Sequence, residues 1–408
     1  MKKSLSILMI CHHRRHKAFA RPHAMAAHLV ERGHQVTLMV ISEKRPVGFV
    51  ENIWDGVRII ETPDLLWGRL RSGWDLWDLF NREVYLSRDK GQYDLIHCFE
   101  TRPVTIYPAL QYCHRHNLPL VTDWNDWWGR GGLIDKNRPR WYSPLFGGIE
   151  TYFEEAFRNR AAGLTVISSA LLQRAIGLGV PPDHICLLPG GAFSDFFLPR
   201  QKEICRNKFG LPLSTPILGY SSVDSMLDLE LALHALSIVA KRYPSVKLII
   251  TGKKDRSITK LAKSIGVEEN IHLTGLLPYE DLPWVLGCAD LFVLPFPDKI
   301  YNVGRWPNKM GDYMSLGRPT ISNPVGDIKK LFESHEIGLL AYEDPVNFAE
   351  KITYIIEHPD IAEKLGGNAR NLAIKEYDWK ILICRLENFY YSILNNSTDD
   401  DDNSRKIR

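Results

Sequence analysis

The amino-acid sequence predicts an α/β protein with two doubly wound, Rossmann-like domains. Short apolar runs alternate with amphipathic segments along the chain, which is the pattern of a parallel sheet with crossover helices. This alternation occurs as two series of similar size, separated by a polar, proline-containing stretch at 198–216. In addition, 408 residues are more than one hydrophobic core usually supports.

The first strand–helix–strand unit lies at the amino end of the chain. "LSILMI" at 5–10 predicts a buried strand, "RPHAMAAHLVERGH" at 21–34 has helical spacing, and "QVTLMVI" at 35–41 predicts the next strand. Gly33 stands where a helix end needs a left-handed residue. Such a unit requires parallel strands.

The remaining elements follow the same alternation. The first series continues with strands at 93–99, 118–124, 163–168 and 184–190, and with helices at 103–116 and 169–177. The second series has strands at 215–221, 246–252, 271–275, 290–296 and 318–324, with helices at 228–242, 256–265 and 279–289. We therefore predict domains at 1–197 and 198–377. The polar, aspartate-rich tail at 395–408 predicts disorder.

Composition argues against several classes of protein. The net charge of +3 is too small to indicate nucleic-acid binding, and no apolar run is long enough to span a membrane. The seven cysteines are scattered without C-x-x-C spacing, which favours buried thiols in a reducing cytoplasm over disulfides or zinc. The amino-terminal apolar run lacks a small-residue cleavage site and predicts a strand rather than a signal peptide.

Ligands of open parallel sheets bind at the carboxyl ends of the strands. In the second domain, "NVGRWPNKMGDYMSLGRP" at 302–319 follows such a strand. A helix beginning at Pro307 would present free backbone amides there, and Arg305 and Lys309 would add charges that suit a phosphate. Asp312 could accept hydrogen bonds from ribose hydroxyls. Charge spacing by itself favours the alternative, a solvated helix with an ordinary Lys–Asp pair.

Two loops of the first domain carry further candidates. "DWNDWWGRGG" at 123–132 concentrates Trp124, Trp127 and Trp128, and it either binds sugar rings by stacking or packs against a neighbouring helix. "CHHRRHKAFARPH" at 11–23 predicts an anion-binding loop with Arg14 and Arg21. The alternatives are a basic surface loop touching anionic lipid and a zinc site, and the cations disfavour zinc.

One histidine and four glutamates are weaker candidates or have simpler interpretations. His97, inside an apolar strand, predicts a buried core histidine. Glu100 at the end of that strand is a weaker site candidate. Glu150, Glu154 and Glu155 predict the solvated face of a helix.

Segments 21–40, 161–197 and 271–326 together resemble the retaining glycosyltransferases of family 4. The resemblance implies the GT-B fold, in which two Rossmann-like domains face each other across a cleft. It also implies that the chain crosses between domains near Gly190 and that helix 378–394 returns to the first domain. The activity implied is transfer from a nucleotide-diphosphate sugar to a glycan, lipid-linked or small-molecule acceptor. Polysaccharide biosynthesis in the cytoplasm or at the inner membrane face, without metal or cofactor, would follow.

The family's donor motif has two glutamates separated by seven residues, ahead of a Met-small-x-Gly-Lys/Arg-Pro stretch. Aligning "MSLGRP" places the second acidic position at Asp312 and the first at Gly304, so the chain reads Pro-x-Lys-x-x-Asp-Tyr-Met instead. The resemblance implies that Asp312 binds the ribose and that Lys309 and Arg305 meet the diphosphate. Asn302 and Gly304 would lie beside them, and the backbone around Gly275 and Leu277 would meet the nucleobase.

Family members often place a histidine at the strand end that here reads Asp123, Trp124 and Asn125. We therefore expect Asp123 or Asp126 to contact the donor sugar, and with Lys309 they are the catalytic candidates. Two rival functions remain open: a nucleotide-sugar epimerase with the same fold, and a catalytically silent scaffold that binds sugar nucleotides. No strand is followed by the G-x-G-x-x-G of nicotinamide dehydrogenases.

Overall fold

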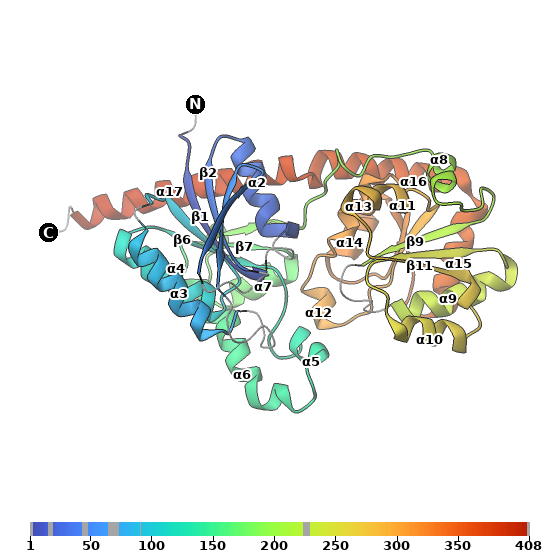
Figure 1. Ribbon diagram of the computed structural model, residues 1–408, viewed down its shortest axis with the longest axis horizontal. Coiled ribbons are helices and arrows are strands. Elements are labelled where there is room, and N and C mark those ends of the chain that lie inside the picture. Colours follow the sequence, from blue (N-terminus) through green and yellow to red (C-terminus); the bar gives the residue numbers. More distant parts are fainter. Residues whose placement is uncertain are drawn as a thin grey trace. The chain divides into compact units, whose positions relative to one another are not determined.

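The structure is a computed structural model that describes residues 3–14, 19–42, 48–63, 73–89, 91–222 and 229–405 (Figure 1). The chain divides into two compact units. Unit 1 comprises Met1–Pro189 with Trp379–Arg408, and unit 2 comprises Gly190–Asp378. The division therefore falls at Pro189, earlier than the predicted boundary after residue 197.

Unit 1 is built on one mostly parallel sheet. Its strands are β1 (Ser6–Arg14), β2 (Gln35–Ile41), β3 (Val50–Trp54), β4 (Val57–Thr62), β5 (Leu95–Phe99), β6 (Leu120–Trp124), β7 (Gly163–Val166) and β8 (Ile185–Leu187). They lie in the order β3-β4-β2-β1-β5-β6-β7-β8, and β3 is antiparallel to β4. Strand order reverses beside β1, since β2 lies on one side of β1 and β5 on the other.

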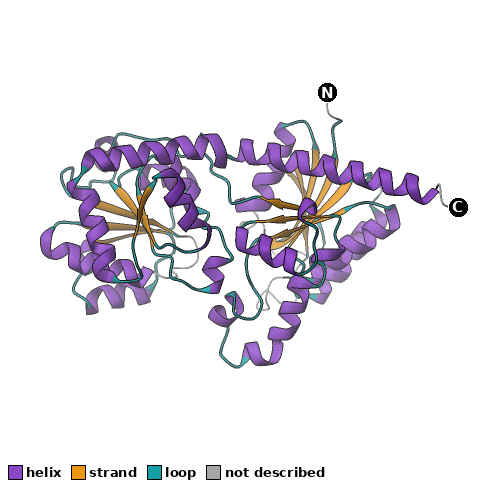
Figure 2. Ribbon diagram, turned by 180° about the vertical axis from the view of Figure 1, so that it is seen from behind, coloured by secondary structure: helices purple, strands orange, loops and turns teal. Residues whose placement is uncertain are grey.

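Helices cover both faces of this sheet (Figures 1 and 2). Among them α3 packs on α4, and α17 packs on α2. The helices of unit 1 are η1 (Phe19–His23), α2 (Ala24–Glu31), α3 (Leu76–Arg88), α4 (Pro103–His116), α5 (Leu133–Asn137), α6 (Tyr142–Glu155), η2 (Arg158–Arg160), α7 (Ser169–Gly177), η3 (Pro182–His184) and α17 (Trp379–Arg405). No helix within the described ranges is both long enough and apolar enough to cross a bilayer.

Unit 2 has a parallel sheet in the order β11-β10-β9-β12-β13-β14. Its strands are β9 (Ile217–Ser221), β10 (Lys247–Thr251), β11 (Ile271–Gly275), β12 (Leu291–Leu294), β13 (Thr320–Ser322) and β14 (Gly338–Leu340). This is the strand order of dinucleotide-binding Rossmann folds, with its switch point between β9 and β12. The sheet packs on α9 and α15 through a core that includes Leu236, Phe348 and Leu291.

The helices of unit 2 follow the strands in alternation, as the sequence predicted. They are α8 (Lys202–Lys208), α9 (Leu229–Arg242), α10 (Arg256–Ser264), η4 (Glu268–Asn270), η5 (Tyr279–Asp281), α11 (Leu282–Leu286), α12 (Ile300–Val303), α13 (Lys309–Ser315), α14 (Gly326–His335), α15 (Pro345–Glu357), α16 (Pro359–Leu372) and η6 (Ala373–Tyr377). Two doubly wound units are thus confirmed.

Local signals predicted several elements closely. The helices predicted at 103–116 and 169–177 are α4 and α7 with the same bounds. Gly33 has φ +89° after α2, and β1 pairs in parallel with β2 from Ser6 opposite Gln35. The first predicted βαβ unit is therefore confirmed.

The β3–β4 hairpin and helix α3 were not predicted. The hairpin turns at Asp55 and Gly56, which have φ +46° and +73°. Asp-Gly is the dipeptide that a two-residue hairpin turn with positive φ favours. This turn signal was therefore present in the sequence.

Helix α17 continues to Arg405, and the disorder predicted from residue 395 remains a prediction. The apolar stretch at 379–394 nucleates the helix, and the polar residues beyond it include no glycine or proline that would stop its propagation.

Helix α17 is held in unit 1 by ion pairs on a buried carboxylate. Glu387 contacts Arg32 Nη2 at 2.7 Å and His34 Nε2 at 3.0 Å. Both partners belong to the α2–β2 connection. The carboxyl-terminal helix therefore stabilises the first βαβ unit.

A second link from α17 runs through buried side chains to the end of β6. Thr165 Oγ1 donates to Asp123 Oδ1 at 2.6 Å, so its oxygen accepts from His97 Nε2 at 3.2 Å. His97 Nδ1 then accepts from the Tyr390 hydroxyl at 2.6 Å. Burial lowers the pKa of His97 to about 4, which keeps the ring neutral near pH 7. The prediction that His97 is a satisfied core histidine is confirmed.

Tyr390→Phe should lower the free energy of unfolding by about 1–3 kcal/mol, because His97 Nδ1 would remain buried without its donor. Chemical denaturation followed by tryptophan fluorescence measures the loss. The matched control is Tyr391→Phe, which removes an exposed hydroxyl bonded to the carbonyl of Lys3 and should cost about 0.5 kcal/mol or less. Equal losses in the two variants would contradict the role given to His97.

Candidate functional site

Helix α13 lies at the switch point of the unit 2 sheet. Its Tyr313 ring stacks on Phe292 of β12 with centroids 3.9 Å apart and planes 4° apart. The Tyr313 hydroxyl accepts a hydrogen bond from the amide of Ser221, the last residue of β9, at 2.8 Å. Residues 223–228, which follow that strand, lie outside the described part of the chain. These contacts place α13 across the carboxyl ends of β9 and β12, where ligands of such sheets bind.

Lys309 and Asp312 lie one turn apart on α13. Lys309 Nζ is 3.9 Å from the centroid of the Tyr220 ring, close to the end of β9. Asp312 is half-buried. Burial raises the pKa of its carboxyl to about 8, against the opposing effect of Lys309. The free protein therefore holds Asp312 largely protonated at neutral pH, and an incoming donor of hydrogen bonds would favour its ionised form.

Arg305 lies in the loop that leads into α13. Its guanidinium is 5.0 Å from the ring of Phe296 and 5.7 Å from that of Tyr301. These contacts hold the Arg305 guanidinium beside the segment that follows β12. The structure thus places all three predicted phosphate- and ribose-binding side chains on consecutive segments at one edge of the sheet.

Two glycines allow this segment to approach the start of unit 2. A Cβ on Gly190 would lie 2.5 Å from Asn308 Oδ1 and 2.7 Å from Trp306 Cδ1. A Cβ on Gly311 would lie 3.1 Å from the Cα of Ala192. No side chain fits at Gly190 without displacing its neighbours, so close backbone packing sets the position of α13.

Asn302 and Gly304 lie in the segment between β12 and α13, and their predicted place beside the donor remains a prediction. Asn302 is fully buried, and its amide nitrogen donates to the carbonyl of Pro297 at 2.7 Å. It therefore holds the loop after β12 in shape. Gly304 follows α12 with φ −83° and has no side chain with which to replace the family's glutamate.

Gly275 and Leu277 lie at the carboxyl end of β11. Gly275 has φ +76°, and its carbonyl accepts a hydrogen bond from the Gly252 amide at 3.1 Å. The loops after β10 and β11 are therefore tied together at this edge. Leu277 is half-buried beyond the turn. Their suggested contact with a nucleobase remains a prediction.

In unit 1, the structure pairs Arg21 with Asp123. Arg21 Nη2 lies 2.8 Å from Asp123 Oδ1, and its Nε donates to both carboxylate oxygens. Burial alone would raise the pKa of Asp123, yet Arg21 and the hydrogen bond from Thr165 lower it. Both side chains are almost fully buried. The predictions of Arg21 as an acceptor-binding residue and of Asp123 as a sugar contact are therefore corrected, because each satisfies the other.

Trp124 also requires a correction. It is completely buried, its Nε1 donates to Glu154 at 3.0 Å, and Arg158 and Arg174 lie over its ring at 4.7 and 4.9 Å. It cannot stack on a sugar. Trp127, with Arg174 at 4.0 Å over its ring, and Trp128 are half-buried and remain candidates.

The prediction that Glu150 and Glu154 lie on a solvated helix face is wrong, because both are buried. Besides Trp124, Glu154 accepts hydrogen bonds from the backbone amides of Trp128 and Gly129. It therefore folds the Trp-rich loop. The sequence signal was their spacing of four residues, which puts both carboxylates on the same side of α6.

A second buried polar group of unit 1 lies around Glu100, at the end of β5, where the Asn125 amide donates to Glu100 Oε1 at 3.2 Å. Glu100 has φ +62°, and burial raises its pKa to about 7 although Arg158 and Arg102 oppose the shift. Asp126 acts on both Glu100 and Arg102 electrostatically, and Arg102 lies 4.8 Å over the ring of Trp128. Glu100 was the weaker candidate from the sequence, and Arg102 was not a candidate, although both follow a predicted strand.

The predicted basic loop is only partly described. Arg14 ends β1, opposite Ile41 of β2, but its side chain and residues 15–18 lie outside the described part of the chain. Within the residues that are described, no group of three His, Cys, Asp or Glu side chains could hold a metal ion.

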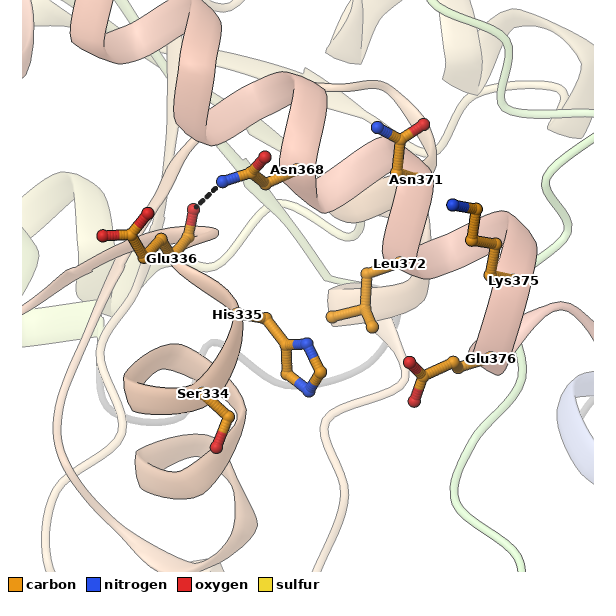
Figure 3. A pocket seen from close by; sticks show the side chains of 8 residues that line it. All are labelled: Ser334, His335, Glu336, Asn368, Asn371, Leu372, Lys375 and Glu376. Carbon is orange, nitrogen blue, oxygen red and sulfur yellow. Dashed lines mark hydrogen bonds between the residues drawn. The ribbon is translucent and has the colours of Figure 1, made fainter.

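A separate hollow of about 430 Å³ lies at the opposite edge of the unit 2 sheet, where α14 ends before β14 begins. Figure 3 shows its lining, which is Ser334, His335, Glu336, Asn368, Asn371, Leu372, Lys375 and Glu376. None of these residues belongs to the predicted site. The strand ends near α13 therefore remain the better candidate.

Family models match both units. Residues 20–191 match the glycosyl transferase 4-like domain, and residues 218–358 match the glycosyl transferases group 1. The two matches follow each other in the order of the units and together take in most of the described chain.

Known proteins with similar sequences or folds include several glycosyltransferases. Alpha-D-kanosaminyltransferase of Streptomyces kanamyceticus is 21% identical over 78% of this chain and 81% of its own. Other curated relatives are matched over about half of their length. Among solved structures, sucrose-phosphate synthase of Thermosynechococcus elongatus is 17% identical with a TM-score of 0.74, covering 96% of this chain and 100% of its own.

An Anabaena protein, HepE, solved with UDP and glucose, is 14% identical with a TM-score of 0.72, covering 95% of this chain and 100% of its own. At such identities the structures establish the fold, and the two family models establish the family. The chain belongs to the group 1, family 4-like glycosyltransferases of GT-B fold, enzymes that transfer a sugar from a nucleotide sugar to an acceptor.

Proposed function

We propose that this glycosyltransferase retains the anomeric configuration of its donor and acts without a metal ion. The donor, a nucleoside-diphosphate sugar, binds along 271–326 of unit 2. The acceptor, a glycan, a lipid-linked sugar or a small molecule, binds unit 1. The observation that carries the proposal is the position of Lys309 and Asp312 on α13, across the switch point of β9 and β12.

Lys309 and Arg305 supply positive charge for the leaving group. When the bond from the sugar C1 to the diphosphate breaks, negative charge develops on the departing oxygen, and fixed cations stabilise it. The acceptor hydroxyl attacks C1 from the face that the diphosphate leaves, and its proton passes to a diphosphate oxygen. This route uses no protein nucleophile and preserves the configuration at C1.

Asp312 binds the ribose in this proposal, and unit 1 supplies the acceptor contacts. Asp126, Trp127 and Trp128 remain from the predicted set, together with Arg14. Glu100 joins them because of its position at a strand end. The similar Anabaena protein was solved with UDP and glucose, which supports a nucleoside-diphosphate hexose as donor.

We also propose that the enzyme works in polysaccharide biosynthesis on the cytoplasmic side, in peripheral contact with the membrane. A lipid-linked acceptor would require such contact. The similar proteins include a structure of WaaG, described as acting in lipopolysaccharide biosynthesis.

Incubation with a panel of nucleotide sugars, with and without acceptors and in the presence of EDTA, tests the activity. We expect nucleoside diphosphate release that depends on an acceptor and survives EDTA, and a product with the donor's anomeric configuration by NMR. Donor binding without turnover would favour a silent scaffold, and acceptor-independent sugar interconversion an epimerase. None of the relatives described above is an epimerase.

Lys309→Ala should weaken binding of a free nucleoside diphosphate roughly tenfold to hundredfold, because a charge-assisted contact contributes about 1.5–3 kcal/mol. Isothermal titration calorimetry measures the affinity. Lys260→Ala, on the exposed face of α10, is the matched control and should leave it unchanged. An unchanged affinity in the Lys309 variant would contradict the phosphate role.

Asp312→Asn should change the pH dependence of stability. The folded carboxyl has a pKa of about 8, raised from its ordinary 3.8, so the folded chain binds a proton that the unfolded chain releases. This group therefore lowers the free energy of unfolding as pH rises from about 4 to 8. Denaturation curves across this range should show a flatter dependence in the variant.

The same variant tests the ribose contact. Ribose hydroxyls donate hydrogen bonds, so the ionised carboxylate binds them best, and wild-type affinity for the diphosphate should rise relative to that of the variant between pH 7 and 9. If the ratio of wild-type to variant affinity for the nucleoside diphosphate stays constant with pH, Asp312 does not bind the nucleotide.

A further inference from the structure

Helix α6 has an inverted amphipathic pattern. Two of its three carboxylates point inward, since Glu150 and Glu154 are each 5% exposed, while Leu145 is 67%, Ile149 48% and Tyr152 52% exposed. An ordinary surface helix buries its apolar stripe and exposes its charges. The outward face of α6 therefore resembles a surface that is normally covered by a partner molecule or a lipid bilayer.

The exposed apolar face is continuous. Trp141 before the helix and Phe146 within it are also exposed, as are Pro144 and Gly148. Spacings of three and four residues place Trp141, Leu145, Ile149 and Tyr152 in one stripe. Contiguous exposed apolar patches of this kind mark interaction sites.

Polar contacts hold this orientation. Glu154 binds backbone amides of the Trp-rich loop and Arg174. Glu150 accepts from the Tyr142 hydroxyl at 3.2 Å, and Thr151 Oγ1 accepts from the Arg130 amide at 3.1 Å. Rotating α6 to bury its apolar stripe would break these hydrogen bonds, so the apolar face stays outward.

Cations border this face. The Arg130 side chain lies along the helix, since a Cβ on Gly148 would be 3.4 Å from its Nη2. Arg138 lies 5.5 Å over the Tyr142 ring, and Arg140 is exposed immediately before the helix. Within the described residues 129–155, the nearby carboxylates are engaged. Asp135 accepts from the Gly131 amide, and Glu155 pairs with Arg174.

We propose that α6 docks this enzyme on an anionic phospholipid surface. The helix lies in the plane of the interface, its apolar stripe enters the boundary between headgroups and acyl chains, and Arg130, Arg138 and Arg140 meet lipid phosphates. Charge complementarity favours lipid over a protein partner. Arginines border the exposed stripe, Glu150 and Glu154 are buried, and Glu155 is paired with Arg174. The inference rests on the proposed membrane contact and assigns it to α6 rather than to the loop at 11–23.

Vesicle flotation tests the docking with the full chain, using phosphatidylcholine vesicles with and without 30% phosphatidylglycerol (a ratio chosen on the order of natural anionic content). We expect wild-type binding to the anionic vesicles and at least about tenfold weaker binding of Leu145→Ser/Ile149→Ser, because two apolar side chains no longer enter the bilayer. Ile53→Ser, at an 80% exposed position on β3, is the matched control and should bind like wild type.

The charged border has its own test. Arg138→Glu/Arg140→Glu should weaken binding to anionic vesicles about tenfold or more, since each basic residue near such a surface contributes about 1 kcal/mol and the change reverses two charges. Binding of the wild type should also fall with added salt. Lys260→Glu/Lys263→Glu on α10 is the control and should bind like wild type.

Two outcomes would overturn the proposal. One is equal vesicle binding by wild type and the α6 variants. The other is sedimentation showing a dimer that Leu145→Ser/Ile149→Ser converts to monomer, which would make a second copy the occupant. Flotation needs no sugar donor, and nucleotide affinity measured without vesicles checks that the variants fold. Failure of the docking proposal is therefore distinguishable from failure of the proposed transferase mechanism.

Discussion

The buried ion pair between Arg21 and Asp123 is the contact on which unit 1 depends. Taking two charges out of water is costly unless every polar atom finds a partner. Here Asp123 also accepts from Thr165, and the chain of hydrogen bonds continues to α17. One carboxylate thus links the segment after β1, the strands β6 and β7 and the carboxyl-terminal helix. Both partners of the pair are buried, so the pair serves the packing of unit 1.

Unit 2 uses the same edge of its sheet differently. Close packing at Gly190 and Gly311 positions α13, and Lys309 Nζ lies 3.9 Å from the centroid of the Tyr220 ring. The carboxyl of Asp312 is instead held at a raised pKa by burial. A carboxyl whose pKa is raised because nearby cations only partly offset the cost of burying its charge is typical of functional sites.

Local patterns accounted for most of the fold and for half of the candidate site. Helices such as α4 were predicted to the residue, because apolar period and capping are local properties. Lys309 and Asp312 were singled out as candidates because they follow a strand of a Rossmann-like series, and their roles remain predictions. Trp124, Arg21 and Glu154 were misjudged, because each is a polar or aromatic residue whose partner lies far away in the sequence. Trp124 and Glu154, for example, meet only when β6 and α6 pack together.

The sequence by itself determined the two doubly wound units, the family and the edge of each sheet at which ligands bind, since these follow from periodicity and strand order. The tertiary structure decided which side chains at those edges remain available, and that α6 turns its apolar stripe outward. Composition cannot show whether a carboxylate faces water or an arginine. Whether a carboxylate is buried depends on the free-energy cost of burying its charge, and that cost is set by the residues that surround it in the folded protein.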